Sequence, residues 1–339
     1  MNTFGRLFRL TTFGESHGPA LGAVIDGCPA GVPLSREQIQ AALDRRRPGQ
    51  SNLTTARQEA DQVEILSGVF EGKTLGTPLA AIVRNTDQRP GDYDKLKTAP
   101  RVGHADLVWQ ERYKHRDHRG GGRSSGRETL SRVIGGAVAD AFLARDLPQL
   151  RVVGWVSRVA TLEAAPPPEG LTRAQVDGHP TRCPDPAAAA KMSEAILAAK
   201  ERGDSLGGCV DVRIEGLPVG LGEPVFDKLK ALVAHAFASV GTVSGLMWGP
   251  SDLEDALRES GSEFHRHKES YGGIQGGLSN GEPVMLRAFL KPPSTVGETA
   301  KAGRHDPCIL PRAVPVLEAM TSIVIADLYL QFLAFPHRA

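Results

Sequence analysis

The chain has 339 residues, of which 40% are hydrophobic and 23% are charged, which excludes wholesale disorder and leaves room for one large or two average domains. Its 40 Lys and Arg residues against 39 Asp and Glu residues give a net charge of +1. This balance argues against a general binder of nucleic acid or of membrane surfaces.

The first third of the chain carries the signals of strands and one helix. The alternating N-terminal segment and the apolar run at 20–25 predict strands around a turn at 14–18. Ser35 and Gln38 have capping-box spacing, which predicts a helix from there to about Pro48. Glycine-bounded apolar runs predict two more strands, at 63–70 and 79–83.

The polar stretch 85–126 shows no clear element, whereas apolar residues at helical spacing predict a helix from 126 to about 145. Beyond it, the predicted elements are a strand at 152–159, a Pro-rich surface loop at 165–170, a helix at 187–202, a strand at 209–214 and a helix at 226–238.

The apolar stretch 314–332 contains Glu318 and Asp327, so it predicts a buried C-terminal helix rather than a membrane span. The mixture of helices and strands predicts an α+β fold, with residues 1–339 forming one domain.

Cysteine usage and the N-terminus bear on the cellular compartment. The cysteines lie far apart without a C-x-x-C pair, which argues against a disulfide framework or a structural zinc site. The first 18 residues lack the apolar core of a signal peptide. We therefore expect a cytoplasmic protein with reduced thiols. The four cysteines are Cys28, Cys183, Cys209 and Cys308.

Arginine dominates the cations, because only 11 of the 40 basic residues are Lys. Arginine suits bidentate binding of carboxylate and phosphate, so concentrated anion sites are expected. The strongest candidate is the segment 117–128, D-H-R-G-G-G-R-S-S-G-R-E, where Arg123, Ser124 and Arg127 surround a predicted helix start that favours anions. Ser125 and Glu128 also have capping-box spacing, and the alternative is a flexible loop before a well-capped helix.

Several histidines lie in glycine-rich or polar turns. His17 lies in G-E-S-H-G, which is either a surface turn or a site where the imidazole serves a bound phosphate. Arg45 to Arg47 end a predicted helix, where they complement its dipole or form an anion pocket. Two further polar turns carry Arg with His and Asp: Arg101, His104 and Asp106, and Arg304, His305 and Asp306.

The remaining histidine spacings, at His115, His118, His265 and His267, match no zinc signature, so no metal is predicted. The glycine segment at 271–277 is not a dinucleotide-binding unit. The Arg/Gly run lacks the interleaved aromatic residues of a nucleic-acid site. Together the motifs predict an enzyme with a large anion pocket and two or three His or Asp proton donors and acceptors.

The motifs resemble those of the chorismate synthase family, in the same order and over essentially the whole chain. They are FGESHG, DRRRPGQS, RVGHAD, RGGGRSSGRET, GDSLGG, GLGEPVFDKL, GGIQGG, KPPST and GRHDPC. The resemblance implies a carbon–oxygen lyase that performs the last step of the shikimate pathway for aromatic amino-acid biosynthesis. In that step 5-enolpyruvylshikimate 3-phosphate loses phosphate by 1,4-trans elimination to give chorismate.

The resemblance also implies a cofactor, a fold and an assembly. The reaction depends on reduced FMN without net redox change, and NADPH acts only indirectly unless the enzyme has an intrinsic flavin reductase. An external flavin reductase is therefore a possible partner. The family fold is expected to be a single-domain β-α-β sandwich, with two antiparallel sheets and helices outside, assembled as a homotetramer without nucleic acid or membrane.

By the same resemblance, site residues fall into three groups. His17 is expected to protonate the departing phosphate, His104 to stabilise negative charge on the flavin, and Asp306 to help flavin N5 accept the substrate proton. The expected substrate contacts are Arg46, Arg101, Arg127 and Arg304. The expected flavin contacts are Arg123, Ser124, Ser125, Gly241, Thr242, Gly276, Lys291, Pro292, Pro293, Ser294, Thr295 and Arg304.

Two departures from the family pattern stand out. Arg46 and Asn52 fall at positions that the family associates with NADP, but the family usually has Arg where this chain has Asn52. The connection from Thr295 to Gly303 is shorter than usual. The alternatives to the lyase are a non-catalytic module that binds phosphorylated or nucleic-acid ligands and a metal-dependent phosphatase.

Overall fold

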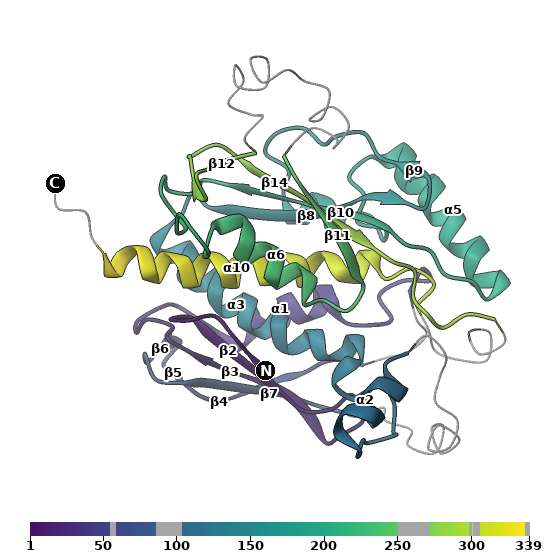
Figure 1. Cartoon of the computed structure of the whole chain (residues 1–339), viewed down its shortest axis with the longest axis horizontal. Coiled ribbons are helices and arrows are strands. Elements are labelled where there is room, and N and C mark those ends of the chain that lie inside the picture. Colours follow the sequence, from purple (N-terminus) through teal and green to yellow (C-terminus); the bar gives the residue numbers. More distant parts are fainter. Residues whose placement is uncertain (55–58, 86–103, 250–271, 298–299, 301–305, 336–339) are drawn as a thin grey trace.

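Two five-stranded antiparallel sheets enclose a layer of helices in the computed structural model of the chain (Figure 1). The structure describes residues 1–54, 59–85, 104–249, 272–297, 300 and 306–335. One continuous apolar core runs from the first sheet through the helices to the second sheet.

The first sheet has the strand order β1-β2-β3-β7-β4. Its residues alternate between buried and more exposed positions, so one face packs on the helices. The strands are β1 (Thr3–Phe4), β2 (Arg9–Phe13), β3 (Ala20–Asp26), β4 (Val63–Ser67) and β7 (Leu79–Arg84), with a separate hairpin of β5 (Val69–Phe70) and β6 (Lys73–Thr74).

The second sheet has the strand order β11-β14-β10-β8-β9. Trp155 on its outer face lies under Val176, so a short helix covers part of that face. The strands are β8 (Arg151–Val159), β9 (Leu162–Glu163), β10 (Gly208–Glu215), β11 (Val243–Trp248) and β14 (Val284–Leu290), with a separate hairpin of β12 (Ile274–Gln275) and β13 (Leu278–Ser279).

The central layer contains the long C-terminal helix, which contacts helices on one side and the second sheet on the other. Gly136 permits the close approach of two of these helices, because a Cβ there would lie 2.3 Å from the Cβ of Ala319. The four helices of this layer are α1 (Arg36–Arg46), α3 (Thr129–Asp146), α6 (Leu229–Ala238) and α10 (Leu310–Ala334). Outside it lie α2 (Asp106–Tyr113), α4 (Arg173–Asp177) and α5 (Pro186–Arg202).

The α+β class and the sandwich of antiparallel sheets are as predicted, but the expectation that the helices lie outside is wrong for the four central helices. Every residue of α10 from 313 to 328 is buried. A helix that is apolar on all sides needs partners on all sides, and a layer between two sheets provides them.

The long apolar helix is a core helix, as predicted. By length and composition α10 would suffice to cross a membrane, but 89% of its most apolar window is buried inside the protein. Its two acidic residues are bonded within the core. Asp327 accepts the backbone N–H groups of residues 6–8, and Glu318 accepts the N–H of Gly154.

Helix boundaries follow the local signals with one exception. Ser35 and Gln38 form the predicted capping box at the start of α1. The capping box predicted for Ser125 and Glu128 does not form, because Ser125 accepts the N–H of Arg127 while Glu128 pairs with Arg132. A 3₁₀ turn at Gly126–Glu128 therefore precedes α3.

The four cysteines are all buried, and burial raises their pKa values. The pKa rises to about 11 for Cys28 and Cys209 and to about 12 for Cys308. At pH 8 these groups are therefore protonated thiols, which are poor nucleophiles.

We predict that the native protein reacts slowly with a chromogenic disulfide reagent at about pH 8, whereas the denatured chain releases four equivalents of chromophore promptly. Time courses with and without denaturant measure this difference. Fast modification of any thiol in the native protein would contradict the burial.

Candidate active site

His17 and His104, which are 87 positions apart in the chain, contact the backbone of two neighbouring glycines. A Cβ on Gly120 would lie 2.2 Å from Nδ1 of His17. A Cβ on Gly121 would lie 3.2 Å from Cε1 and Nε2 of His104. Only glycine accommodates the first contact, and the φ of Gly120 is also +81°, a conformation that favours glycine. The structure thus brings together two of the predicted proton-handling residues.

The turn that carries His17 is fixed from two directions. Gly14 has a φ of +89°, and a Cβ there would lie 2.2 Å from the carbonyl oxygen of Ala20. The side chain of Asn85 donates to the carbonyl of Gly18 over 2.6 Å. Ser16 Oγ lies 3.0 Å from Nδ1 of the buried His17. Of the two alternatives for this segment, an exposed surface turn is therefore excluded for His17.

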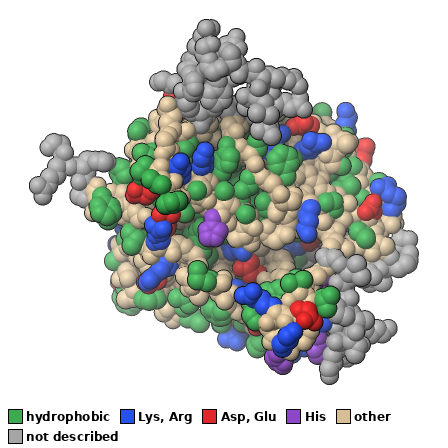
Figure 2. Space-filling view, viewed as in Figure 1, with side chains coloured by type: hydrophobic (Ala, Val, Ile, Leu, Met, Phe, Trp, Pro, Cys, Tyr) green, Lys and Arg blue, Asp and Glu red, His purple; other side chains and the backbone are tan. Residues whose placement is uncertain are grey.

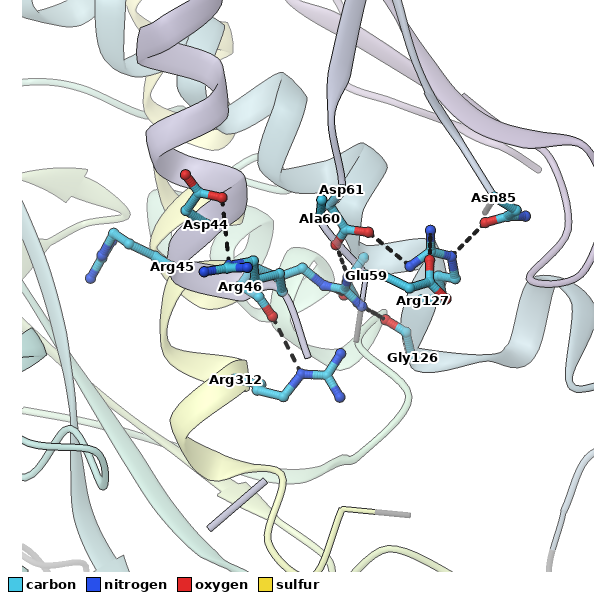
Figure 3. Close-up of polar contacts among 12 residues, drawn as sticks. Asp44, Arg45, Arg46, Glu59, Ala60, Asp61, Asn85, Gly126, Arg127 and Arg312 are labelled. Atoms are coloured by element: carbon cyan, nitrogen blue, oxygen red, sulfur yellow. Dashed lines mark hydrogen bonds and ion pairs between the residues drawn. The ribbon is translucent and has the colours of Figure 1, made fainter. Parts of the chain in front are cut away.

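Two predicted substrate-binding arginines share one buried carboxylate (Figure 3). Asp61 Oδ2 accepts from Nη1 of Arg46 over 3.0 Å, and Oδ1 accepts from Nη1 of Arg127 over 2.8 Å. The Asp61 side chain is 0% exposed and that of Arg46 is 1% exposed. Glu59 forms a second ion pair with Arg127, so Arg127 has two carboxylate partners and Arg46 has one.

The other donors of these arginines bind nearby backbone and side chains. Arg46 donates to the carbonyl of Gly126 over 2.8 Å and to the hydroxyl of Thr129 over 3.1 Å. Arg127 donates through Nε to the side chain of Asn85 over 2.7 Å. Since Asn85 also holds Gly18, the arginine pair is connected to the turn that carries His17.

Arg45 and Arg46 point in different directions from the end of α1 (Figure 3). Arg45 pairs with Asp177 and Glu318, away from the site. Complete burial lowers the pKa of Arg46 to about 9; the nearby cations of Arg312 and Arg127 act in the same direction, and Asp61 opposes them. Arg46 is therefore a cation at neutral pH, and additional negative charge nearby would stabilise it.

Asp306 is connected to the same arginine cluster through α10. Its carboxylate forms an ion pair with Nη1 of Arg312, in the first turn of that helix. Nε of Arg312 donates to the backbone carbonyl of Arg46 over 3.3 Å. A residue near the C-terminus and one from the first fifth of the chain are thus held by one guanidinium.

A cavity of about 750 Å³ adjoins the glycine loop, which comprises residues 120–124. Its walls include the end of β2 with the following turn, α2, and the loop at 120–124. Trp109 and Tyr113 from α2 line it, with ring centroids 5.3 Å apart. This volume lies within the range of about 300–1,000 Å³ typical of small-molecule sites. Figure 2 shows Lys, Arg and His side chains at the surface around α2.

The predicted flavin residues of the glycine loop line this cavity in part. Arg123 and Ser124 line it, whereas Ser125 caps the following turn. Arg123 donates to the carbonyls of Gly14 and Thr12, so its guanidinium holds the loop against β2. Ser124 donates to the carbonyl of Gly121 over 2.7 Å.

Other predicted flavin residues lie near the end of α6 and the end of β14. Arg132 on α3 pairs with Glu128 and donates to Ser239, two positions before Gly241. The carbonyl of Thr242 accepts the backbone N–H of Lys291 over 3.0 Å, which places two predicted segments side by side. Pro293 accepts from Ser205, whose neighbour Leu206 bonds to Pro307 beside Asp306.

These segments do not all meet in one cavity. Pro292 lines a second hollow of about 440 Å³ with Arg158 and Ser205. Gly276 lies in the β12–β13 turn, in the layer of the second sheet and away from α2 (Figure 1). No described contact joins Gly276 to the glycine loop. Arg101, Arg304, His265, His267 and His305 lie outside the described residues.

Asn52 and the remaining histidines are also placed. The carbonyl of Asn52 accepts from Lys200 over 2.7 Å, while the residue itself is exposed. His115 lines the first cavity, and His118 lies on the same loop. Among the described residues, no group of three or more His, Cys, Asp or Glu side chains is arranged to hold a metal ion.

Four residues of the network were not singled out by sequence reasoning: Glu59, Asp61, Asn85 and Arg312. No motif marks them, since each is an isolated polar residue beside a predicted element. One signal was available for Arg312, which interrupts an otherwise apolar helix start six positions after Asp306. Asp61 has a φ of +44°, which sequence spacing does not reveal.

Comparison with known proteins gives a consistent result. A family model described as "Chorismate synthase" matches residues 8–330. A chorismate synthase from Synechocystis is 46% identical, and the match covers 98% of each chain. One from a Synechococcus strain is 48% identical over 96% of this chain and 92% of its own.

A solved structure titled "Crystal Structure of Chorismate Synthase" superposes with a TM-score of 0.78 at 32% identity. It covers 96% of this chain and 93% of its own. A family model that spans nearly the whole chain, and relatives that are almost half identical to it, show that this chain is a lyase of the chorismate synthase family.

Proposed function

We propose that the chain converts 5-enolpyruvylshikimate 3-phosphate into chorismate and phosphate by 1,4-trans elimination, with reduced FMN bound. The observation that carries the proposal is the contact of both His17 and His104 with Gly120 and Gly121, beside a buried arginine pair. We further propose that residues 1–339 act as one domain of a cytoplasmic homotetramer, without nucleic acid or membrane partners.

The residues around the first cavity fit a flavin. The backbone at Gly120 and Gly121, which lines this cavity, lies so close to both imidazoles that side chains there would collide with them. Trp109 and Tyr113 offer aromatic surface to a planar ring, and the Arg123 guanidinium, beside Ser124 on the same wall, offers positive charge to a phosphate. Reduced FMN, when bound, supplies the electron-rich ring that assists loss of the phosphate.

We assign to the arginines the binding and orientation of the anionic substrate. The substrate has two carboxylates and a phosphate, whose burial requires fixed cations and N–H donors. Arg127 is held by Asp61, Glu59 and Asn85, so its position is set before a ligand arrives. Arg46 supplies positive potential from within the protein, and the resemblance adds Arg101 and Arg304.

We assign the proton transfers to three residues. His17, which packs against Gly120 of the glycine loop, donates a proton to the departing phosphate. His104, which precedes α2 and faces Gly121 of the same loop, stabilises negative charge beside the flavin. Asp306, held by Arg312, assists removal of the substrate proton. The fixed network limits the reorganisation that these transfers require.

We propose that an external flavin reductase supplies reduced FMN and that NADPH acts only indirectly. The position that the family associates with NADP carries Asn52, a neutral side chain that cannot pair with a phosphate as Arg does. The alternative of a binding module for nucleic acid gains no support from the Arg/Gly run at 119–127, because that run lacks the interleaved aromatic residues of a nucleic-acid site.

The test is anaerobic release of chorismate and phosphate from the substrate, with chemically reduced FMN in one reaction and oxidised FMN plus NADPH in another. The proposal predicts chorismate only with reduced FMN. Chorismate in both reactions would show an intrinsic flavin reductase and overturn the need for an external one. Absence of chorismate from both reactions would overturn the proposed reaction.

We predict that His17→Ala, His104→Ala and Asp306→Asn each slow turnover by about 10²–10⁴-fold, because each removes a proton-transfer or charge-stabilising group. Steady-state rates with reduced FMN measure the effect, and thermal unfolding verifies the fold. The control is His235→Ala, an exposed histidine on α6, which keeps its rate. A near-normal rate in any of the three variants would remove that residue from the mechanism.

We also predict that Gly120→Ala reduces turnover at least tenfold, because a methyl group there collides with His17 and strains the backbone at positive φ. The matched control is Gly245→Ala in β11, where the nearest atom would lie at an ordinary 3.4 Å. Turnover rates of the two variants, measured with reduced FMN, test this prediction. Equal rates would show that the approach of the loop to His17 is dispensable.

A further inference from the structure

Asp106 is a buried carboxylate that contacts a proposed active-site residue. It begins helix α2, and its side chain is 3% exposed. Burying a carboxylate costs free energy unless it is paired, so the groups that Asp106 contacts indicate its role. Its Oδ1 lies 2.8 Å from Nδ1 of His104.

The contact constrains the imidazole chemically. An ionised carboxylate only accepts hydrogen bonds, so Nδ1 of His104 carries the proton that is donated to Asp106. Nε2 is then the nitrogen that has a lone pair when the ring is neutral. That edge of the ring faces the glycine loop, because a Cβ on Gly121 would lie 3.2 Å from Nε2.

A second charged group supports the carboxylate from the far end of α2. The helix ends at Tyr113, and the chain turns at the capping residue Lys114, whose φ is +57°. Nη1 of Arg116 lies 3.8 Å from the same Oδ1, and its side chain is 9% exposed. The free N–H groups at the start of α2 also favour a carboxylate at this position. Asp106 is thus held independently of His104.

His17, which contacts the neighbouring Gly120, provides a contrast. Its Nδ1 lies 3.0 Å from the hydroxyl of Ser16. A hydroxyl donates or accepts, so this contact does not select a tautomer. Of the two imidazoles, only His104 has a described carboxylate partner that selects the nitrogen bearing the proton.

We propose that Asp106 is a positioning residue that fixes His104 as the Nδ1–H tautomer and directs Nε2 toward the Gly121 side of the loop. The catalytic consequence rests on the function proposed above. Carboxylates that orient a metal-ligating histidine typically contribute about 10–100-fold to metal affinity or activity. An Asp that orients a catalytic His contributes more to kcat.

The first test reads the tautomer directly and needs no activity. Protein labelled with ¹⁵N-histidine is examined by NMR at about pH 8.5, above the ordinary imidazole pKa of about 6.5. The His104 signals are identified by their loss in His104→Ala. The proposal predicts a proton on Nδ1 in the wild-type protein and a mixed or reversed tautomer in Asp106→Asn. A wild-type His104 protonated on Nε2 would overturn it.

The second test compares kcat and KM with reduced FMN. Asp106→Asn is expected to lower kcat by about 10–100-fold, with KM for the substrate changed less than about threefold. Glu111→Gln is the control, since Glu111 is an exposed carboxylate on the same helix that pairs with Lys114. An unchanged kcat in Asp106→Asn would overturn the positioning role even if the tautomer is as expected.

The two tests separate this inference from the proposed function. If the wild-type protein forms no chorismate, the proposed function fails, while the tautomer measurement still decides what Asp106 does to His104. If Asp106→Asn does not fold, the wild-type tautomer alone remains decisive, because an Nε2–H ring contradicts the proposal without any variant.

Discussion

The shared carboxylate of Asp61 is the interaction on which the rest of the site depends. Two guanidinium groups at 1% and 4% exposure would repel each other without an anion between them. Removing one partner from a buried ion pair costs about 3–5 kcal/mol, because the other charge remains buried. Asp61 therefore fixes the end of α1 against the turn that precedes α3.

From this carboxylate the network extends in two directions. Through Arg127 and Asn85 it reaches the turn of His17, and from there the glycine loop and His104. Through Arg46 and Arg312 it reaches Asp306. The charged part of the site is rigid because each described arginine in it is bonded. The uncharged part depends on glycine, since side chains at 120 and 121 would separate the loop from the imidazoles.

The sequence predicted individual elements better than their arrangement. Ser35 and Gln38 predicted the start of α1 because a capping box is a local interaction. The apolar stretch before Phe332 predicted a buried helix, yet nothing local showed that four helices lie between the sheets. Asp61 was not predicted because its role depends on hydrogen bonds to Arg46 and Arg127, which are 15 and 66 positions away in the chain. Helix α2 was not predicted because its apolar residues do not form the buried stripe that marks a helix in a sequence. Leu107 and Val108, for example, are exposed.

The candidate site was predictable where a motif carries its own geometry. The glycines at 120–122 and the histidine at 17 indicated a ligand loop before their contact was known. The resemblance supplied roles for residues that the structure places in separate hollows, such as Pro292.

The most direct test is a crystal structure of the protein with FMN and the phosphorylated substrate bound. The account predicts the flavin in the cavity between α2 and the glycine loop, with the substrate within reach of His17 and Arg127. A flavin bound instead in the hollow beside Arg158 and Pro292, with the glycine loop free of ligand, would contradict it.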